Sequence, residues 1–308
     1  MIEMSSETYS CINTDVLLRR GSDQDSMHVT AFLGVYITFG VVSTILNTLV
    51  IGTLLFSKDL HGTFYIILTS LFASDLITGV VIFPMLAIIN ALSTPRNCAL
   101  LDSCQYFVHT ISLSSIFSMM AIAYDRYLRV AKRHTYNIFM TKTKGFAIVI
   151  SIWVAAPFLG LISLIVSAKI IAFTAVCVIC LILYLYVMML KKLRSNVNQV
   201  PANAPTRPQV KSQDGGVRRS SRLVFILVLV MLMLWCPYIV LSMMSGTVAY
   251  LRNVYAFAAI QQLPLLSAMS SPFLYFWTNR TTRRSFVAFC LKVYCRKAEA
   301  DRIVTVCT

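Results

Sequence analysis

Long apolar stretches follow one another along the whole chain, with polar connections between them. They cover roughly residues 29–56, 63–91, 100–124, 146–166, 170–190, 221–246 and 254–277. A helix of about 20 apolar residues spans the hydrocarbon core of a bilayer, and its backbone groups are all satisfied within the segment. The pattern lacks the period-two alternation of a membrane β-barrel. It therefore predicts an all-α, integral membrane bundle of seven transmembrane helices over residues 29–277.

The remaining segments are polar and predict three further parts. Residues 1–28 form an N-terminal tail, and residues 278–308 form a C-terminal tail. Within the bundle, residues 196–216 are rich in Pro, Asn and Gln without hydrophobic periodicity, which predicts a flexible linker. The connection after residue 166 carries a single charge, Lys169, and must be very tight. A short amphipathic helix after the seventh span is predicted by apolar spacing i, i+3, i+4, i+7 at Phe286, Phe289, Cys290 and Val293.

Composition and charge place the chain in a membrane with a defined orientation. Hydrophobic residues make up 57% of the chain and charged residues 13%, whereas soluble domains carry about 25% charged residues. Of the 27 Lys and Arg residues, 22 fall on one side of the predicted bundle. The positive-inside rule then predicts a multi-pass membrane protein with its N-terminus outside and its C-terminus inside. The net charge of +15 is interpreted as a cytoplasmic fringe for anionic membrane lipids, and not as a nucleic-acid surface.

Asp75 is the only acidic residue deep within any predicted span. A charge at the centre of a bilayer costs about 2.5–3.5 kcal/mol on insertion scales, so such residues are usually functional. The carboxylate is either protonated and bonded to its own helix, or stabilised by a cation and polar neighbours. Asn47 in the first span and Ser115 in the third are the candidate neighbours.

The third span ends on an acid followed directly by an arginine, Asp125 and Arg126. A side chain that reaches toward the headgroups would explain the arginine alone, but not the acid before it. A latch explains both, because the pair can close in one state and release Arg126 toward a partner in another. Pro237, two residues after Trp235, predicts a hinge in the sixth span. Pro272 lies three residues before Tyr275 in the seventh span.

Taken together, these features resemble the rhodopsin-like (class A) G-protein-coupled receptors over nearly the whole chain. The segments "LNTLVI", "SLFASDL", "AYDRY", "LWCP" and "SPFLY" look like motifs of that family, with Leu234 and Ser271 replacing its usual Cys and Asn. The resemblance implies a heterotrimeric G protein as partner, reached by Arg126 when the sixth helix moves outward. It also implies a sodium-type site at Asn47, Asp75 and Ser115, with no other cofactor. The residues implied in coupling and switching are Asp125, Arg126, Tyr127, Tyr186, Trp235, Pro237, Pro272 and Tyr275.

Departures from the family pattern narrow the resemblance. The second outer loop lacks a cysteine, and Val178 replaces the proline expected in the fifth span. With "LHGTFY", these traits are similar to the melanocortin, cannabinoid, lysophospholipid and adenosine branch, and melanocortin receptors match best in this loop and span. Met85 and Gln105 stand where melanocortin receptors would carry acids, with only Asp102 nearby, which implies a ligand other than a cationic peptide.

The resemblance also places a ligand pocket in the outer half of the bundle. Val108 stands where amine receptors carry an Asp, and Leu265 where opsins carry the retinal lysine. The expected lining is neutral and half apolar, which favours an uncharged or lipid-like extracellular ligand. His109 is either a pocket contact or a hydrogen-bonded packing residue. The expected lining residues are Gln105, Val108, His109, Ser112, Tyr238, Ser242, Gln261 and Leu265.

Two other classes of protein remain open at this point. A seven-helix transporter or channel would show paired charges or broken helices along a pore, and a receptor-like protein that no longer signals would tolerate Ser271 and Val178. An enzyme is the least expected class, because the sequence shows no nucleophile–base or metal-ligand cluster. Cys290 and Cys295, beside the basic amphipathic segment, are candidate palmitoylation sites. The sequence leaves open whether a disulfide forms among Cys11, Cys98 and Cys104.

Overall fold

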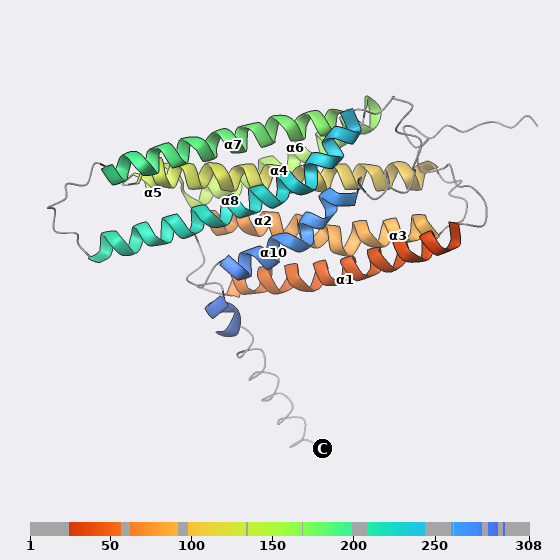
Figure 1. The fold of residues 1–308 in the computed structure, drawn as a ribbon, viewed down its shortest axis with the longest axis horizontal. Helices are drawn as coiled ribbons and strands as arrows, with labels where there is room; N and C mark the ends of the chain where they lie inside the picture. The colour runs from red at the N-terminus through yellow and green to blue at the C-terminus, as the bar shows by residue number, and fades with distance from the viewer. Residues whose placement is uncertain are drawn as a thin grey trace, which may run out of the picture.

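A computed structural model describes residues 25–56, 62–91, 98–133, 135–167, 169–198, 208–243, 260, 262–278, 283–288 and 292. These residues contain helices and no strand, which confirms the all-α prediction. The long helices run side by side as a bundle (Figure 1). Their bounds are α1 Asp25–Phe56, α2 Thr63–Ile77, a π-helical turn η2 Thr78–Ile82, α3 Phe83–Ala91, α4 Cys98–Ala131, α5 Tyr136–Phe139, α6 Lys142–Ile165, α7 Lys169–Asn198, α8 Pro208–Met243, a 3-10 turn η4 Leu263–Leu266 and α10 Ser267–Thr278.

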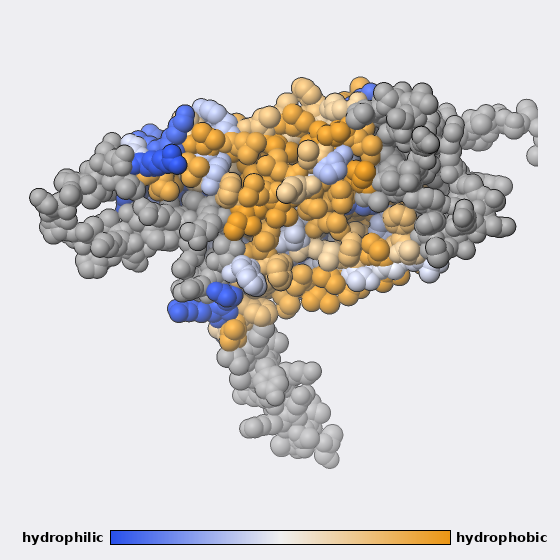
Figure 2. Space-filling view, viewed as in Figure 1, coloured by the Kyte–Doolittle hydropathy of each residue, from blue (hydrophilic) through white to orange (hydrophobic). Residues whose placement is uncertain are grey.

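Six of the predicted spans are long and apolar enough to cross a membrane within the part of the chain that the structure describes. They are Thr30–Phe56, Thr63–Ile89, Ala99–Ala131, Lys142–Ile165, Lys169–Ser195 and Phe225–Met243. The described part of the seventh range forms η4 and α10. A hydrophobic belt crosses the helices, and hydrophilic residues gather at the end where α5 and the start of α8 lie (Figure 2). Exposed apolar side chains such as Phe158 (65%) and Met233 (78%) suit a surface that faces lipid.

The second span contains a wide turn that sequence periodicity does not reveal. Between α2 and α3 the π-helical turn η2 ends directly before Phe83, whose backbone N–H donates to Thr78 O. Pro84 follows, and a proline inside a helix removes one backbone bond and crowds the preceding turn. The wider turn therefore relieves this crowding. Within it, a Cβ on Gly79 would lie 2.7 Å from Thr44 Oγ1 and 2.9 Å from Thr44 N, so glycine permits the close approach of α1.

The connections differ in part from the sequence prediction. The predicted flexible linker over 196–216 is helical at both ends, because α7 runs to Asn198 and α8 begins at Pro208. Proline is favoured in the first turn of a helix, where its missing N–H costs nothing. Adding turns to an existing long helix is also cheaper than starting a new one. The turn between α6 and α7 is as tight as predicted, since α6 ends at Ile165 and α7 begins at Lys169.

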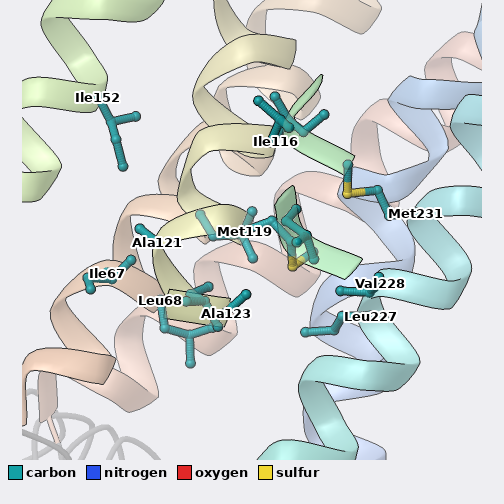
Figure 3. Packing of buried hydrophobic residues seen from close by; sticks show 14 of the residues in the cluster. Ile67, Leu68, Ile116, Met119, Ala121, Ala123, Ile152, Leu227, Val228 and Met231 are labelled. Carbon is teal, nitrogen blue, oxygen red and sulfur yellow. The ribbon is translucent and has the colours of Figure 1, made fainter. Parts of the chain in front are cut away.

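α4 is the central helix of the bundle and packs against α2, α6, α7 and α8. The main hydrophobic core lies around its inner half, with side chains from α2, α4, α6 and α8 (Figure 3). Beyond the bundle, residues 283–288 are helical, and the Phe286 ring packs edge-on against Phe276 of α10 at 5.0 Å. This agrees with the predicted helix after the seventh span, although Phe289, Cys290 and Val293 lie outside the described residues.

Candidate functional site

The acid and the arginine near the C-terminal end of α4 form a closed, buried pair. Asp125 is fully buried, and Arg126 is 6% exposed. The Arg126 Nε donates to Asp125 Oδ2 at 3.0 Å, and Nη2 donates to the same oxygen at 2.5 Å. A buried arginine paired with its neighbour does not match the alternative of an anchor reaching toward headgroups. This closed pair is the geometry that the latch hypothesis requires.

The phenol of Tyr136 is a second partner of Asp125. Tyr136 begins the short helix α5, is 5% exposed, and donates its hydroxyl proton to Asp125 Oδ1 at 2.5 Å. Burial and the neighbouring Asp125 charge raise the pKa of Tyr136, so the phenol stays protonated and remains a donor. Sequence reasoning missed this residue. Its only signal was a tyrosine in a basic connection, which is too common to single out.

Two aromatic rings cover the arginines at this end of α4. The Arg126 Cζ lies 3.7 Å from the ring centroid of Phe64 in α2, and the Arg129 Cζ lies 4.3 Å from that of Tyr136. Cations over ring faces at these distances are attracted by the ring quadrupole. The predicted neighbour Tyr127 is half-buried and packs against the main core. The end of α4 is thus joined to the start of α2 and to α5 by contacts between charged and aromatic side chains.

The other predicted switch residues lie at helix interfaces. Tyr186 of α7 stacks on Phe225 of α8, with ring centroids 4.6 Å apart and planes 13° apart. Tyr275 of α10 is fully buried, and its ring lies 5.4 Å from that of Phe72. Trp235 is 3% exposed and packs edge-on against Tyr238 at 5.9 Å. Pro237 and Pro272 lie inside α8 and α10, as the hinge interpretation requires.

Asp75 is buried at the middle of the bundle, among serines and apolar side chains. It is 1% exposed, and Ser115 Oγ donates to its Oδ1 at 3.0 Å. Its Oδ2 has no hydrogen-bond partner among the described residues. The carboxylate borders a cavity of about 20 Å³, which Ser115, Ser271 and Trp235 also line. That volume has room for one particle the size of water.

Asn47 does not line this cavity. Its amide nitrogen donates to Ala268 O of α10 at 2.9 Å and to Ser43 O at 2.8 Å. Ser43 in turn donates to the backbone oxygen of Asp75 at 3.2 Å. The structure therefore brings Asp75 and Ser115 into direct contact, whereas Asn47 joins α1 to α10. Ser271, the family departure, lines the cavity and donates to Ser267 O at 2.8 Å.

The predicted ligand-pocket residues are only partly brought together. Val108 and Leu265 belong to one apolar cluster, which is formed mostly by side chains of α1, η2 and α3. Tyr238 has Ser242 within hydrogen-bonding reach one turn along α8. Gln105 and Ser112 are half-buried on α4. Gln261 and the candidate lipidation residues Cys290 and Cys295 lie outside the described residues. Cys104, one of the three cysteines whose pairing the sequence leaves open, is a buried free thiol.

His109 packs between two helices. It is 6% exposed, and its Nδ1 lies 2.8 Å from Ser163 Oγ of α6. The Ser163 hydroxyl donates to Gly160 O at 2.7 Å, so its oxygen accepts a hydrogen bond from the Nδ1–H tautomer of the histidine. This arrangement is the packing alternative for His109. A Cβ on Gly160 would lie 2.5 Å from Thr110 Oγ1, so α4 and α6 are in close contact here.

Comparison with known proteins agrees with this arrangement. Residues 46–171 match the family described as "7 transmembrane receptor (rhodopsin family)". The chain is 25% identical over 282 residues to melanocortin receptor 4 of Danio rerio, which covers 83% of this chain and 82% of the relative. It is 24% identical over 273 residues to melanocortin receptor 5 of Homo sapiens, covering 82% of each chain. These relatives are receptors and not enzymes, and the six apolar helices of this chain are those of a multi-pass membrane protein. In its motifs, its helical bundle and these matches, the chain is similar to the rhodopsin-like (class A) G-protein-coupled receptors and, among them, to the melanocortin receptors.

Proposed function

We propose that this receptor binds an uncharged or lipid-like extracellular ligand and activates a heterotrimeric G protein by releasing Arg126. One observation carries the proposal: the Asp125–Arg126 pair at the inner end of α4 is closed, and both side chains are buried. The pair opens when the Arg126 side chain changes its conformation, and a small displacement of a neighbouring helix can favour that change. Arg126 then becomes available to the G protein.

The displacement that opens the latch is an outward movement of α8. Pro237 cannot donate a backbone bond, so α8 can bend there beside the buried Trp235. The Tyr186–Phe225 stack joins α7 to α8 near the middle of both helices and has to rearrange when α8 moves. Trp235 also borders the Asp75 cavity, so a ligand that shifts the indole changes the packing around both.

The ligand class is inferred from the neutral outer half of the bundle. Val108 and Leu265 supply apolar surface, and Tyr238 and Ser112 supply hydrogen-bonding groups. Met85 and Gln105 replace the acids that the melanocortin resemblance leads us to expect. A melanocortin-type peptide is the competing ligand class, because the relatives bear that name.

The orientation follows from the charge asymmetry, with the N-terminus outside the plasma membrane and the basic segments inside. The inner tail carries seven of the 22 inner Lys and Arg residues. Positive charge of this kind binds anionic lipid headgroups. Palmitoyl chains on Cys290 and Cys295 would add a second anchor beside the helix at residues 283–288.

The Asp75 cavity fits a sodium ion. The buried Oδ2 of Asp75 has no hydrogen-bond partner in the described part of the chain, and the cavity beside it holds one small particle. Asp75, Ser115 and Ser271 supply the oxygen donors that a hard cation prefers. A bound sodium would neutralise the carboxylate and stabilise the resting packing around Trp235. Asn47 supports the site indirectly, through Ser43 and the backbone of Asp75.

The proposal is tested by second-messenger output in transfected cells for wild type and Arg126→Ala, both basal and across panels of lipids, nucleosides and peptides. We expect a ligand-dependent output from wild type that Arg126→Ala abolishes at equal surface expression. Wild-type output equal to that of empty vector under every ligand would refute the signalling function. A response to peptides alone would refute the ligand class and leave the signalling function standing.

A further inference from the structure

The side chain of Arg126, on α4, is in contact with the ring of Phe64, which belongs to α2. Phe64 lies in the first turn of α2 and is 6% exposed, the same exposed fraction as Arg126. The Arg126 Cζ lies 3.7 Å from its ring centroid. A guanidinium within about 6 Å of a ring face is attracted to it, and more strongly when both groups are shielded from water. Both groups here are shielded.

The carboxylate and the ring contact different parts of the guanidinium. Asp125 accepts from Nε and Nη2, which lie on one edge of the planar group. The ring of Phe64 lies against the Cζ atom and hence against the flat face. A guanidinium can use its edge and its face at the same time. The two contacts therefore add to each other and do not compete.

The two contacts also differ in what they join. Asp125 and Arg126 are neighbours on α4, so their pair moves with that helix as one unit. Phe64 belongs to α2, and its contact with Arg126 crosses between helices. The contact between helices opposes the swing of Arg126 away from α2, and the pair within α4 opposes the same swing from the side of Asp125.

Phe64 is itself held in place. Its ring packs edge-on against Tyr65, with centroids 5.1 Å apart. The preceding residue, Thr63, donates to Met140 O at 3.3 Å. A Cβ on Gly145 of α6 would lie 2.7 Å from the Thr63 methyl group, so α6 presses against this turn. The start of α2 is held by its hydrogen bond to Met140 O and by its close contact with α6. The Phe64 ring therefore cannot follow Arg126 when the arginine leaves.

We propose that Phe64 is a positioning residue that restrains Arg126 in the resting state through the face of its ring. The inference rests on the proposed release of Arg126 toward a G protein. It predicts that the basal activity of the receptor depends on the electron density of this ring, beyond the volume that the side chain fills.

The test replaces Phe64 with phenylalanine analogues that carry one, two or three fluorine atoms. Fluorine weakens the negative ring face and changes the volume little. We expect basal nucleotide exchange on purified G proteins to rise stepwise with each fluorine, to between about fivefold and thirtyfold in total. Phe64→Tyr should keep the resting level, and Phe64→Leu should raise it. The same analogues at Phe146, an exposed residue of α6, serve as the matched control and should have no effect.

A second measurement reports on the contact without a G protein. The fluorine resonance of 4-fluorophenylalanine at position 64 should shift when Arg126→Gln removes the cation. A resonance that does not move would overturn the inference. Basal exchange that follows side-chain volume and ignores fluorine number would also overturn it, because packing alone would then explain Phe64.

Failure of the proposed function has a different signature. In that case Asp125→Asn also leaves exchange at the level of receptor-free membranes, and the restraint by Phe64 has no signalling role. If Asp125→Asn raises exchange and the fluorinated series does not, the proposed function stands and the role of Phe64 is refuted.

Discussion

The Asp125→Asn substitution probes the closed latch most directly. It keeps the size of the side chain and removes its negative charge, which leaves the Arg126 guanidinium buried without its charged partner. Hydrogen bonds to charged groups contribute about 1.5–3 kcal/mol, and breaking a buried pair costs about 3–5 kcal/mol. The asparagine oxygen can still accept from Tyr136, so the lower range applies.

This cost falls mainly on the resting state, because Arg126 leaves the site in the active state. A loss of about 1.5–3 kcal/mol multiplies the ratio of active to resting receptor by about 10 to 150. For a receptor with about 1% in the active state, this substitution raises the fraction to between about 10% and 60%. Constitutive activity of that size is easily measured.

The assay is ligand-free nucleotide exchange in membranes, normalised to receptor on the cell surface. Asp102→Asn is the matched control, since it makes the same change near the outer end of α4. We expect a large rise for Asp125→Asn and none for the control. If Asp125→Asn reaches the surface and its basal exchange equals that of the control, the closed pair does not restrain signalling.

Three further predictions concern the interior of the bundle. Asp75→Asn should abolish any shift of melting temperature caused by sodium; a shift equal to that of wild type would remove the carboxylate from the ion site. Gly79→Ala should lower the melting temperature, because the new methyl group would meet α1, whereas Gly34→Ala, with open space around it, should not; equal melting temperatures would contradict the close approach. His109→Ala should lower the free energy of unfolding by about 1–3 kcal/mol, because Ser163 loses its hydrogen-bond partner. Unchanged thermal stability together with altered ligand potency would show that His109 is a pocket contact and not a packing residue.

The spans could be predicted well from the sequence because lipid offers no hydrogen-bond partners to the backbone. Every backbone group has to be satisfied inside the segment, so apolar length alone indicates a helix. The short turn between α6 and α7 followed in the same way, since the apolar runs leave almost no residues for it. The linker prediction over 196–216 was wrong at its ends, because in water helix formation also depends on how far a neighbouring helix extends.

Candidate site residues could be found from the sequence where a charged residue falls in or beside an apolar run. The cost of burying such a charge is evident from the run itself. Asp75, Asp125 and Arg126 stand out because each interrupts or ends an apolar run. Their partners did not stand out. Tyr136 and Phe64 are aromatic residues in ordinary positions, and nothing in their own segments marks them.

The sequence by itself determined the class of solvent, the helices and the places where charge enters the membrane. Only the tertiary structure decided that Arg126 lies on Phe64, that Tyr136 donates to Asp125, and that His109 faces α6. Apolar length and charge act within a segment, and a single chain displays them directly. A contact between two side chains depends on how two helices are rotated against each other, and that rotation is set by the packing of the whole bundle.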